Sequence, residues 1–329
     1  MRLRGILIAS AVLGVAVLVG ALAPTPSAPA TTKTTTASDA TTVRALNIAG
    51  PFSQPPKLDV GDTSAMPKPD VRAVTFTSDA LSRSMPYSIY LPPGYDNNAR
   101  RYPVLYMLHG MSGTNDEWRG YGIFETADRM IRSGELRPLI IVLPQGDKAY
   151  WVDHALPADK EAWGRYMAKD VVGSVDAKFR TLADAPHRAI GGVSMGAHGA
   201  VQLAMTYPGE FSVVGAHSLV LRRYDTAPAY FGSQADWAKR DPMQLVYAKA
   251  DTMKNVDLWI DIGADDPWAK LAEQFNGELN ALKIPHQWHE WAGDHSAKYW
   301  CSHLSEYLRF YDTALATHEF ARADHSRLL

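Results

Sequence analysis

The sequence has only one cysteine in 329 residues, Cys301, and this scarcity excludes several architectures. A single thiol cannot form an intrachain disulfide or build a cysteine-rich metal cluster. We expect Cys301 to be a buried thiol on a C-terminal helix, with pairing between two chains as the alternative. No spacing of His, Asp and Glu resembles a catalytic zinc site. We therefore expect no metal and no other cofactor.

The chain also lacks an excess of charge of one sign, since 33 Lys and Arg residues nearly balance 35 Asp and Glu residues. A protein that binds nucleic acid through a broad basic surface needs a marked positive excess. No basic run is interleaved with aromatic residues, as a platform for single strands would require. Nucleic acid is therefore not expected as a partner.

The amino terminus has the features of a targeting segment. Residues 1–4 carry two arginines, residues 5–23 are apolar or small, and residues 24–30 are rich in Pro, Ala and Ser. We predict that residues 1–30 are a signal peptide or an uncleaved membrane anchor, because the apolar run is just long enough to span a bilayer. Either way the remainder would be exported: secreted, periplasmic or anchored on the outer side of the cytoplasmic membrane. The Thr-, Ala-, Pro- and Ser-rich residues 31–66 predict a flexible linker.

From residue 67 to 316 the pattern predicts one α/β domain, followed by a polar tail over 317–329. Strands are expected at 71–76, 87–91, 104–108, 139–143, 189–193, 211–216, 258–262 and 286–291. Helices are expected at 124–133, 161–179, 197–207, 267–282 and 297–315. Apolar strands that alternate with helices predict a mainly parallel central sheet with helices on both faces. Such a sheet presents its chemistry at the carboxyl ends of its strands, and residues 220–255 are expected to form an insertion over that edge.

The most informative motif is Gly192-Val193-Ser194-Met195-Gly196, which lies between an expected strand and an expected helix. This context is typical of a nucleophile elbow, where a sharp turn holds the serine above the sheet. The flanking glycines let the backbone approach closely, and the helix N-terminus favours developing negative charge. Ser194 is therefore the candidate nucleophile.

A nucleophilic serine needs a base, and in this fold the order along the chain is serine, acid, histidine. His295 is the best candidate base because it follows the expected strand at 286–291 and precedes the last helix. Asp265 and Asp266 follow the strand at 258–262, and the spacing allows either to be the acid. The remaining histidines near these strands and helices, His198, His289 and His303, are expected to be structural.

An oxyanion hole needs two backbone N–H groups. Met195, directly after the nucleophile, would supply one, and Met111 in the loop after the strand at 104–108 would supply the other. Trp118, Trp151 and Trp268 could line an acyl or aryl pocket, with packing under surface loops as the alternative.

The chain from about residue 71 to 315 resembles the esterase D/feruloyl esterase/mycolyltransferase group of the α/β-hydrolase superfamily. The segments that carry the resemblance are Tyr102-Pro103-Val104-Leu105-Tyr106-Met107-Leu108-His109-Gly110, Tyr150-Trp151-Val152-Asp153 with Trp163, Gly191 to Gly196, Gly263-Ala264-Asp265-Asp266, and Gly293-Asp294-His295 with Tyr299-Trp300. The resemblance implies an α/β-hydrolase fold, a triad of Ser194, Asp266 and His295, and Met111 and Met195 as oxyanion donors. Two consecutive aspartates leave the acid open to test. The export leader and the distant cysteine argue against a cytosolic thioester hydrolase such as formylglutathione hydrolase.

Together these features predict an exported serine hydrolase that cleaves carboxylic esters through an acyl-enzyme on Ser194. Its expected substrate is a small-molecule or polysaccharide-linked ester. One alternative is an acyltransferase of the same family that uses a sugar or another alcohol as acceptor. A second alternative is a surface-binding protein that kept the fold and lost activity, which a fluorophosphonate probe would fail to label.

Overall fold

The computed structural model describes residues 67–327, with side chains up to residue 318. The expected leader (1–30) and linker (31–66) lie outside the described residues. An eight-stranded sheet with the order β1-β2-β4-β3-β5-β6-β7-β8 forms the centre of the domain. Its strands are β1 (Asp70–Ser78), β2 (Arg83–Leu91), β3 (Val104–Leu108), β4 (Ile140–Pro144), β5 (Arg188–Val193), β6 (Val213–His217), β7 (Asp257–Gly263) and β8 (Gln287–Trp291).

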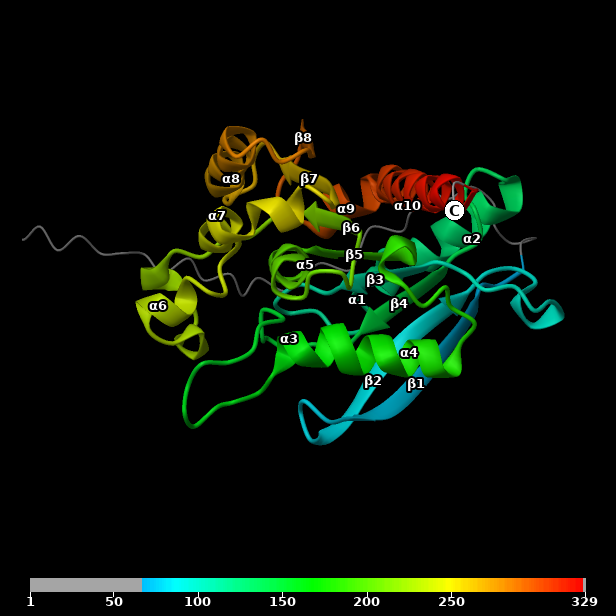
Figure 1. Ribbon diagram of the computed structural model, residues 1–329, viewed down its shortest axis with the longest axis horizontal. Helices are drawn as coiled ribbons and strands as arrows, with labels where there is room; N and C mark the ends of the chain where they lie inside the picture. Colours follow the sequence, from blue (N-terminus) through cyan, green and yellow to red (C-terminus); the bar gives the residue numbers. More distant parts are fainter. Residues whose placement is uncertain (1–66, 328–329) are drawn as a thin grey trace, which may run out of the picture. The chain divides into compact units, whose positions relative to one another are not determined.

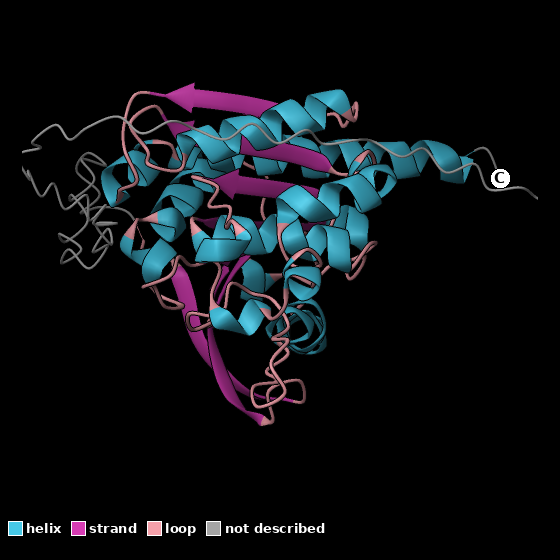
Figure 2. Cartoon of the chain, turned by 90° about the vertical axis from the view of Figure 1, so that its left-hand side faces the viewer, coloured by secondary structure: helices cyan, strands magenta, loops and turns pink. Residues whose placement is uncertain are grey.

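The sheet is parallel from β4 through β8, and only the β1–β2 hairpin runs antiparallel to its neighbours. The central strands are buried on both faces and read as continuous apolar runs, as parallel strands covered by helices must. The carboxyl ends of β3, β5, β6, β7 and β8 therefore meet at one edge. The hairpin extends beyond the helical layers at the bottom of Figures 1 and 2.

Helices cover both faces, and alternate strand residues divide between two cores. Leu105 and Met107 pack into one core, whereas Tyr106 and Leu108 pack into the other. The first face carries α1 (Glu117–Gly120), α2 (Ile123–Ser133), α9 (Ala297–Ser302) and α10 (Leu304–Arg327). The second carries α3 (Trp163–Arg165), the π-helix η2 (Tyr166–Val171), α4 (Val172–Lys178), α5 (Met195–Thr206), α7 (Pro242–Met253) and α8 (Ala269–Ala281). Figure 1 shows α2 and α10 on one side of the sheet and α4 on the other. The predicted layered architecture is confirmed.

Two boundaries differ from the expectation. The last helix was expected over 297–315, but it breaks at His303 and then continues to Arg327. The polar residues from 317 to 327 therefore belong to α10. A polar stretch without Gly or Pro can continue a helix, because polarity indicates solvent exposure and does not by itself end the helix. The expected helix over 161–179 contains the π-helical segment η2, which the apolar periodicity does not reveal.

The expected insertion lies between β6 and β7. It contains two 3₁₀ turns, η4 (Tyr224–Thr226) and η5 (Ala229–Phe231), then α6 (Gln234–Trp237) and α7. His198 on α5 contacts this insertion at two points. Its Nδ1 lies 3.1 Å from the carbonyl oxygen of Val220, and its Nε2 lies 3.1 Å from the carbonyl oxygen of Arg240. Within residues 67–327, no helix combines the length and apolarity needed to cross a bilayer.

Candidate active site

Ser194 stands in a sharp turn between β5 and α5, with φ of 57° and ψ of −114°. Its N–H donates to the carbonyl oxygen of His217, which fixes the turn against β6. The turn is possible because Gly192 and Gly196 lack side chains. A Cβ on Gly192 would lie 2.5 Å from the backbone of Gly196, and one on Gly196 would lie 2.3 Å from the carbonyl oxygen of Leu108. The positive φ and the close backbone contacts are those of a nucleophile elbow.

The structure brings together the three residues predicted as a triad. The Ser194 hydroxyl lies 2.9 Å from Nε2 of His295, and Nδ1 of His295 lies 2.7 Å from Oδ2 of Asp266. They come from loops at the carboxyl ends of β5, β7 and β8. The Asp266 side chain is fully buried, whereas that of His295 is 20% exposed. In this arrangement the imidazole can take the proton of the hydroxyl group while the buried carboxylate orients the imidazole, which makes the hydroxyl oxygen a nucleophile.

Of the two adjacent aspartates, Asp266 is the one whose carboxylate contacts His295. Oδ1 accepts the N–H of Trp268 at 2.9 Å while Oδ2 faces His295. Asp265 is exposed, and its own N–H donates to the carbonyl oxygen of Gly293. Asp266 therefore contacts both the imidazole of His295 and the turn that leads into α8, each through a different oxygen.

The predicted oxyanion donors flank Ser194. Met195 is the first residue of α5, where a backbone N–H has no acceptor in a preceding turn. The N–H of Met111 has no acceptor among residues 67–327. Gly110 brings the Met111 loop close, since a Cβ built on it would lie 3.5 Å from Cβ of Ser194. Two N–H groups without protein partners beside a nucleophile can stabilise a developing oxyanion.

Glu117 is a site residue that the sequence reasoning missed. Its Oε2 accepts the N–H of Gly110 at 2.6 Å, and its Oε1 accepts the hydroxyl of Tyr121 at 2.8 Å. Burial raises the pKa of Glu117, against the opposing effect of these two donors. Because the Gly110 N–H donates to this carboxylate, it is not available to an oxyanion, which leaves the N–H of Met111 as the candidate donor in this loop. No sequence signal marks Glu117, which looks like one more acidic residue in a polar loop.

The sequence also contains no indication of a buried polar network beneath the elbow. Nδ1 of His217 lies 2.6 Å from Oδ1 of Asp261, and its Nε2 lies 2.8 Å from the hydroxyl of Tyr311. Asp261 accepts three further hydrogen bonds, from Trp259, Tyr299 and Tyr307. His217 is the residue whose carbonyl oxygen holds the N–H of Ser194, so the network supports the elbow from below.

The prediction that Trp118 and Trp151 line a pocket is wrong. Trp118 is 1% exposed and Trp151 is fully buried. The indole N–H of Trp118 donates to the carbonyl oxygen of Leu108, and that of Trp151 donates to the carbonyl oxygen of His109. They pack beneath the loops, which is the alternative that the sequence left open. Trp268 is half-buried, and the guanidinium of Arg222 lies 4.4 Å above its ring.

His198, His289 and His303 pack within the fold, and Cys301 is a buried thiol on a C-terminal helix, as expected. His289 stacks on Trp259 and His303 stacks on Trp291. His198 is buried, and desolvation lowers its pKa to about 4 despite the two carbonyl oxygens beside it. Cys301 is a free, buried thiol on α9, and burial raises its pKa to about 11.

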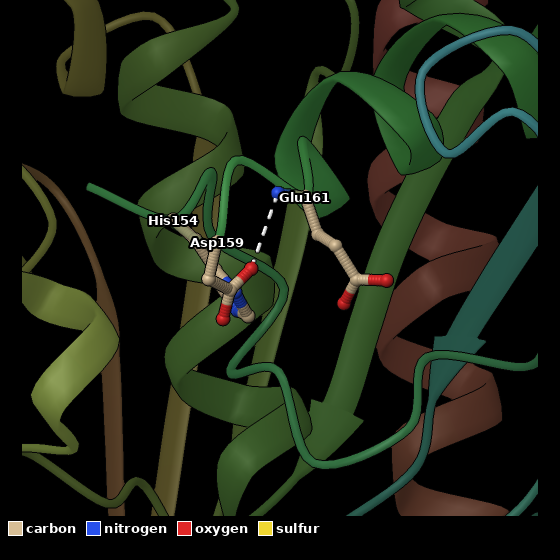
Figure 3. Close-up of side chains that lie close together, drawn as sticks. All are labelled: His154, Asp159 and Glu161. Carbon is tan, nitrogen blue, oxygen red and sulfur yellow. Dashed lines mark hydrogen bonds and ion pairs between the residues drawn. The ribbon is translucent and has the colours of Figure 1, made fainter. Parts of the chain in front are cut away.

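One group of potential metal ligands occurs in the loop before α3: His154, Asp159 and Glu161. Nδ1 of His154 lies 2.8 Å from Asp159, and the possible ligand atoms of all three residues lie within 4.8 Å of one another, although the Glu161 carboxylate contacts neither of the other side chains (Figure 3). Both Glu161 oxygens are already engaged, one by Arg83 at 2.6 Å and one by the indole N–H of Trp163 at 2.9 Å. Only two ligands remain, fewer than a structural or catalytic zinc site uses, and the group fits an ordinary polar cluster better.

Comparison with known proteins assigns the chain to a family. The model of the family described as "Putative esterase" matches residues 78–311. The chain belongs to this family. The resemblance inferred from the motifs is confirmed, and the fold is that of the α/β hydrolases.

Individual relatives agree with this assignment. An esterase of Mycobacterium tuberculosis is 29% identical over 210 residues, which are 62% of this chain and 43% of the relative. The chain therefore spans less than half the length of that curated relative. A xylanase/feruloyl esterase of Xylanibacter ruminicola is 29% identical over 133 residues, 39% of this chain and 18% of the relative. Among solved structures, a ferulic acid esterase superposes with a TM-score of 0.68 at 25% identity, covering 75% of this chain and 99% of that one. An S-formylglutathione hydrolase from Agrobacterium tumefaciens shares the fold, with a TM-score of 0.65 at 20% identity over 75% of this chain and 96% of that one.

Proposed function

We propose that the chain is an exported serine carboxylesterase that works through an acyl-enzyme on Ser194. The observation that carries the proposal is the continuous contact from Ser194 Oγ through His295 to Asp266, at 2.9 and 2.7 Å. Export rests on the sequence of residues 1–30 alone.

In the proposed reaction, Ser194 Oγ attacks the ester carbonyl carbon while His295 Nε2 takes its proton. The N–H groups of Met111 and Met195 hold the oxyanion of the tetrahedral intermediate. His295 then returns the proton to the leaving alkoxide as the ester C–O bond breaks. Water, activated by the same imidazole, attacks the acyl-enzyme and releases the carboxylic acid. Asp266 orients the imidazole and stabilises its charged form throughout.

The substrate class we propose is an ester of an aromatic or short acyl group, either free or linked to a polysaccharide. The names of two relatives, a ferulic acid esterase and a xylanase/feruloyl esterase, support this choice. The direct experiment is to assay the purified chain on methyl ferulate and 4-nitrophenyl acetate. We expect hydrolysis of at least one ester, and a loss of roughly 10⁴ in kcat in Ser194→Ala. Ser302→Ala is the matched control, because Ser302 is exposed on α9 and should keep wild-type turnover. Failure of the wild-type chain to hydrolyse any ester would overturn the proposal.

A further inference from the structure

The dipeptide His217-Ser218 at the end of β6 is connected to both reacting residues of the triad. The carbonyl oxygen of His217 accepts the N–H of Ser194 at 3.0 Å. The next residue, Ser218, is fully buried, and its hydroxyl oxygen accepts the indole N–H of Trp300 at 2.9 Å. Trp300 is 2% exposed, and its ring packs against the imidazole of His295. The nucleophile and the base are therefore both tied to one turn of the backbone.

Ser218 is held in an uncommon backbone conformation. Its φ is 50°, in the left-handed region that a residue with a side chain seldom adopts. Its N–H donates to the carbonyl oxygen of Asp261 at 2.8 Å. Such a conformation costs free energy and persists only where the surrounding structure enforces it. In this conformation the Ser218 hydroxyl meets the indole N–H of Trp300.

Trp300 supplies a contact to His295 that Asp266 alone cannot give. The hydrogen bond between Nδ1 and Asp266 fixes one point of the imidazole, and the ring can still tilt about that point. The indole of Trp300 meets the imidazole nearly at a right angle, with ring centroids 5.2 Å apart and planes at 88°. This edge-to-face arrangement is favoured between aromatic rings. Together the two contacts fix the plane of the imidazole as well as its position.

Trp300 also reaches the side chains that support the oxyanion loop. Its ring centroid lies 5.6 Å from that of Tyr121, whose hydroxyl donates to Glu117. Glu117 in turn accepts the N–H of Gly110. A shift of the indole would therefore disturb the base and the oxyanion loop together.

We propose that Ser218 and Trp300 are positioning residues, which hold the imidazole of His295 in the plane that lets Nε2 reach the Ser194 hydroxyl. They act through His295 and take no part in proton transfer themselves. The proposal rests on the proposed esterase function, in which His295 takes the Ser194 proton across 2.9 Å. Loss of this alignment slows the reaction steeply, whereas binding of the ester does not depend on it.

The test measures kcat and KM for 4-nitrophenyl acetate, with kcat expressed per site that a fluorophosphonate probe labels. Ser218→Ala removes the acceptor of the indole N–H. Trp300→Phe removes the donor and keeps an aromatic ring beside the imidazole. Each change should lower kcat roughly tenfold and leave KM within about twofold, because a small misplacement of the base affects the transition state and not the bound ester.

The double variant distinguishes one shared hydrogen bond from two independent effects. If the bond between Ser218 and Trp300 transmits the effect, the variant with both changes should again lose roughly tenfold, because each single change already removes that bond. Independent effects would multiply to a loss of roughly a hundredfold.

Ser218→Gly removes the hydroxyl without the cost of a positive φ, because glycine adopts this conformation readily. This variant should therefore fold, and we expect the same loss of roughly tenfold in kcat. Trp163→Phe is the matched control. Trp163 on α3 is 1% exposed, and its indole N–H donates to Glu161 at 2.9 Å. Loss of this buried hydrogen bond should lower stability and leave kcat per labelled site unchanged.

An unchanged kcat in Ser218→Ala and Ser218→Gly, or multiplied losses in the double variant, would overturn the positioning role and leave the esterase function standing. If the wild-type chain hydrolyses no ester, the proposed function fails, and the rate constant of fluorophosphonate labelling then replaces kcat, since labelling uses the same serine and base. Slower labelling of Ser218→Ala, with Trp163→Phe at the wild-type rate, would support the positioning role. Absence of labelling in the wild-type chain would overturn both proposals.

Discussion

Asp266 divides its carboxylate between His295 and Trp268, with Oδ2 on the imidazole Nδ1 at 2.7 Å and Oδ1 on the backbone N–H at 2.9 Å. The same buried group thereby orients the base and begins the turn that leads into α8. Because the two contacts use different oxygens, a substitution can separate the two roles.

Asp266→Asn is expected to lower kcat by up to about 10⁴, because the amide favours the wrong imidazole tautomer. Asn keeps one oxygen for the Trp268 N–H, so the free energy of unfolding should change by only about 1 kcal/mol or less. Asp265→Asn is the matched control and should keep near-normal turnover, since Asp265 is exposed. The measurement is kcat of both variants from steady-state kinetics. A loss of kcat confined to Asp265→Asn would show that Asp265, and not Asp266, is the catalytic acid.

Glu117 is expected to position the oxyanion loop through its hydrogen bond to the Gly110 N–H. Glu117→Ala removes the acceptor, and kcat should fall roughly 10²-fold with KM changed only slightly, because the Met111 N–H is used in the transition state. Glu117→Gln keeps an oxygen acceptor and should recover most of the rate. Asp116→Ala, on the exposed neighbouring carboxylate, serves as control. Equal losses in the Ala and Gln variants would argue against a positioning role.

His198 is expected to make the domain less stable in mild acid. Its pKa in the folded state is about 4, below the ordinary 6.5, because burial disfavours the charged ring. The unfolded chain therefore binds the proton more tightly, and stability is lost as pH falls from 6.5 toward 4, by up to about 3 kcal/mol. Urea unfolding at pH 7 and pH 5 measures the effect. The loss between these values should be roughly 2 kcal/mol smaller in His198→Gln; an identical loss would contradict the assignment.

Chelation is expected to leave activity intact, because the triad and oxyanion donors need no metal, and in the His154 cluster Arg83 and Trp163 engage both oxygens of Glu161 while His154 pairs with Asp159. The measurement is ester hydrolysis before and after dialysis against EDTA. A loss of activity that added metal restores would show that a metal takes part.

The central features of the site could be predicted because each leaves a local mark in the sequence. Gly192, Ser194 and Gly196 stand between a strand and a helix, and His295 follows a strand, so topology alone brings them to one edge. Glu117 and the His217–Asp261 pair leave no such mark, because their roles depend on side chains that approach only after folding. Trp118 and Trp151 show the reverse error: a large aromatic residue near a site motif fits a pocket and a core equally well until its burial is known.

The identity of the nucleophile is tested most directly by mapping a fluorophosphonate label. The wild-type chain is treated with the probe, digested, and examined by peptide mass spectrometry. We predict a single adduct on the peptide that contains Ser194, its absence in Ser194→Ala, and a parallel loss of ester hydrolysis. An adduct on another serine, or a Ser194→Ala variant that keeps more than about a tenth of the wild-type kcat, would contradict the account.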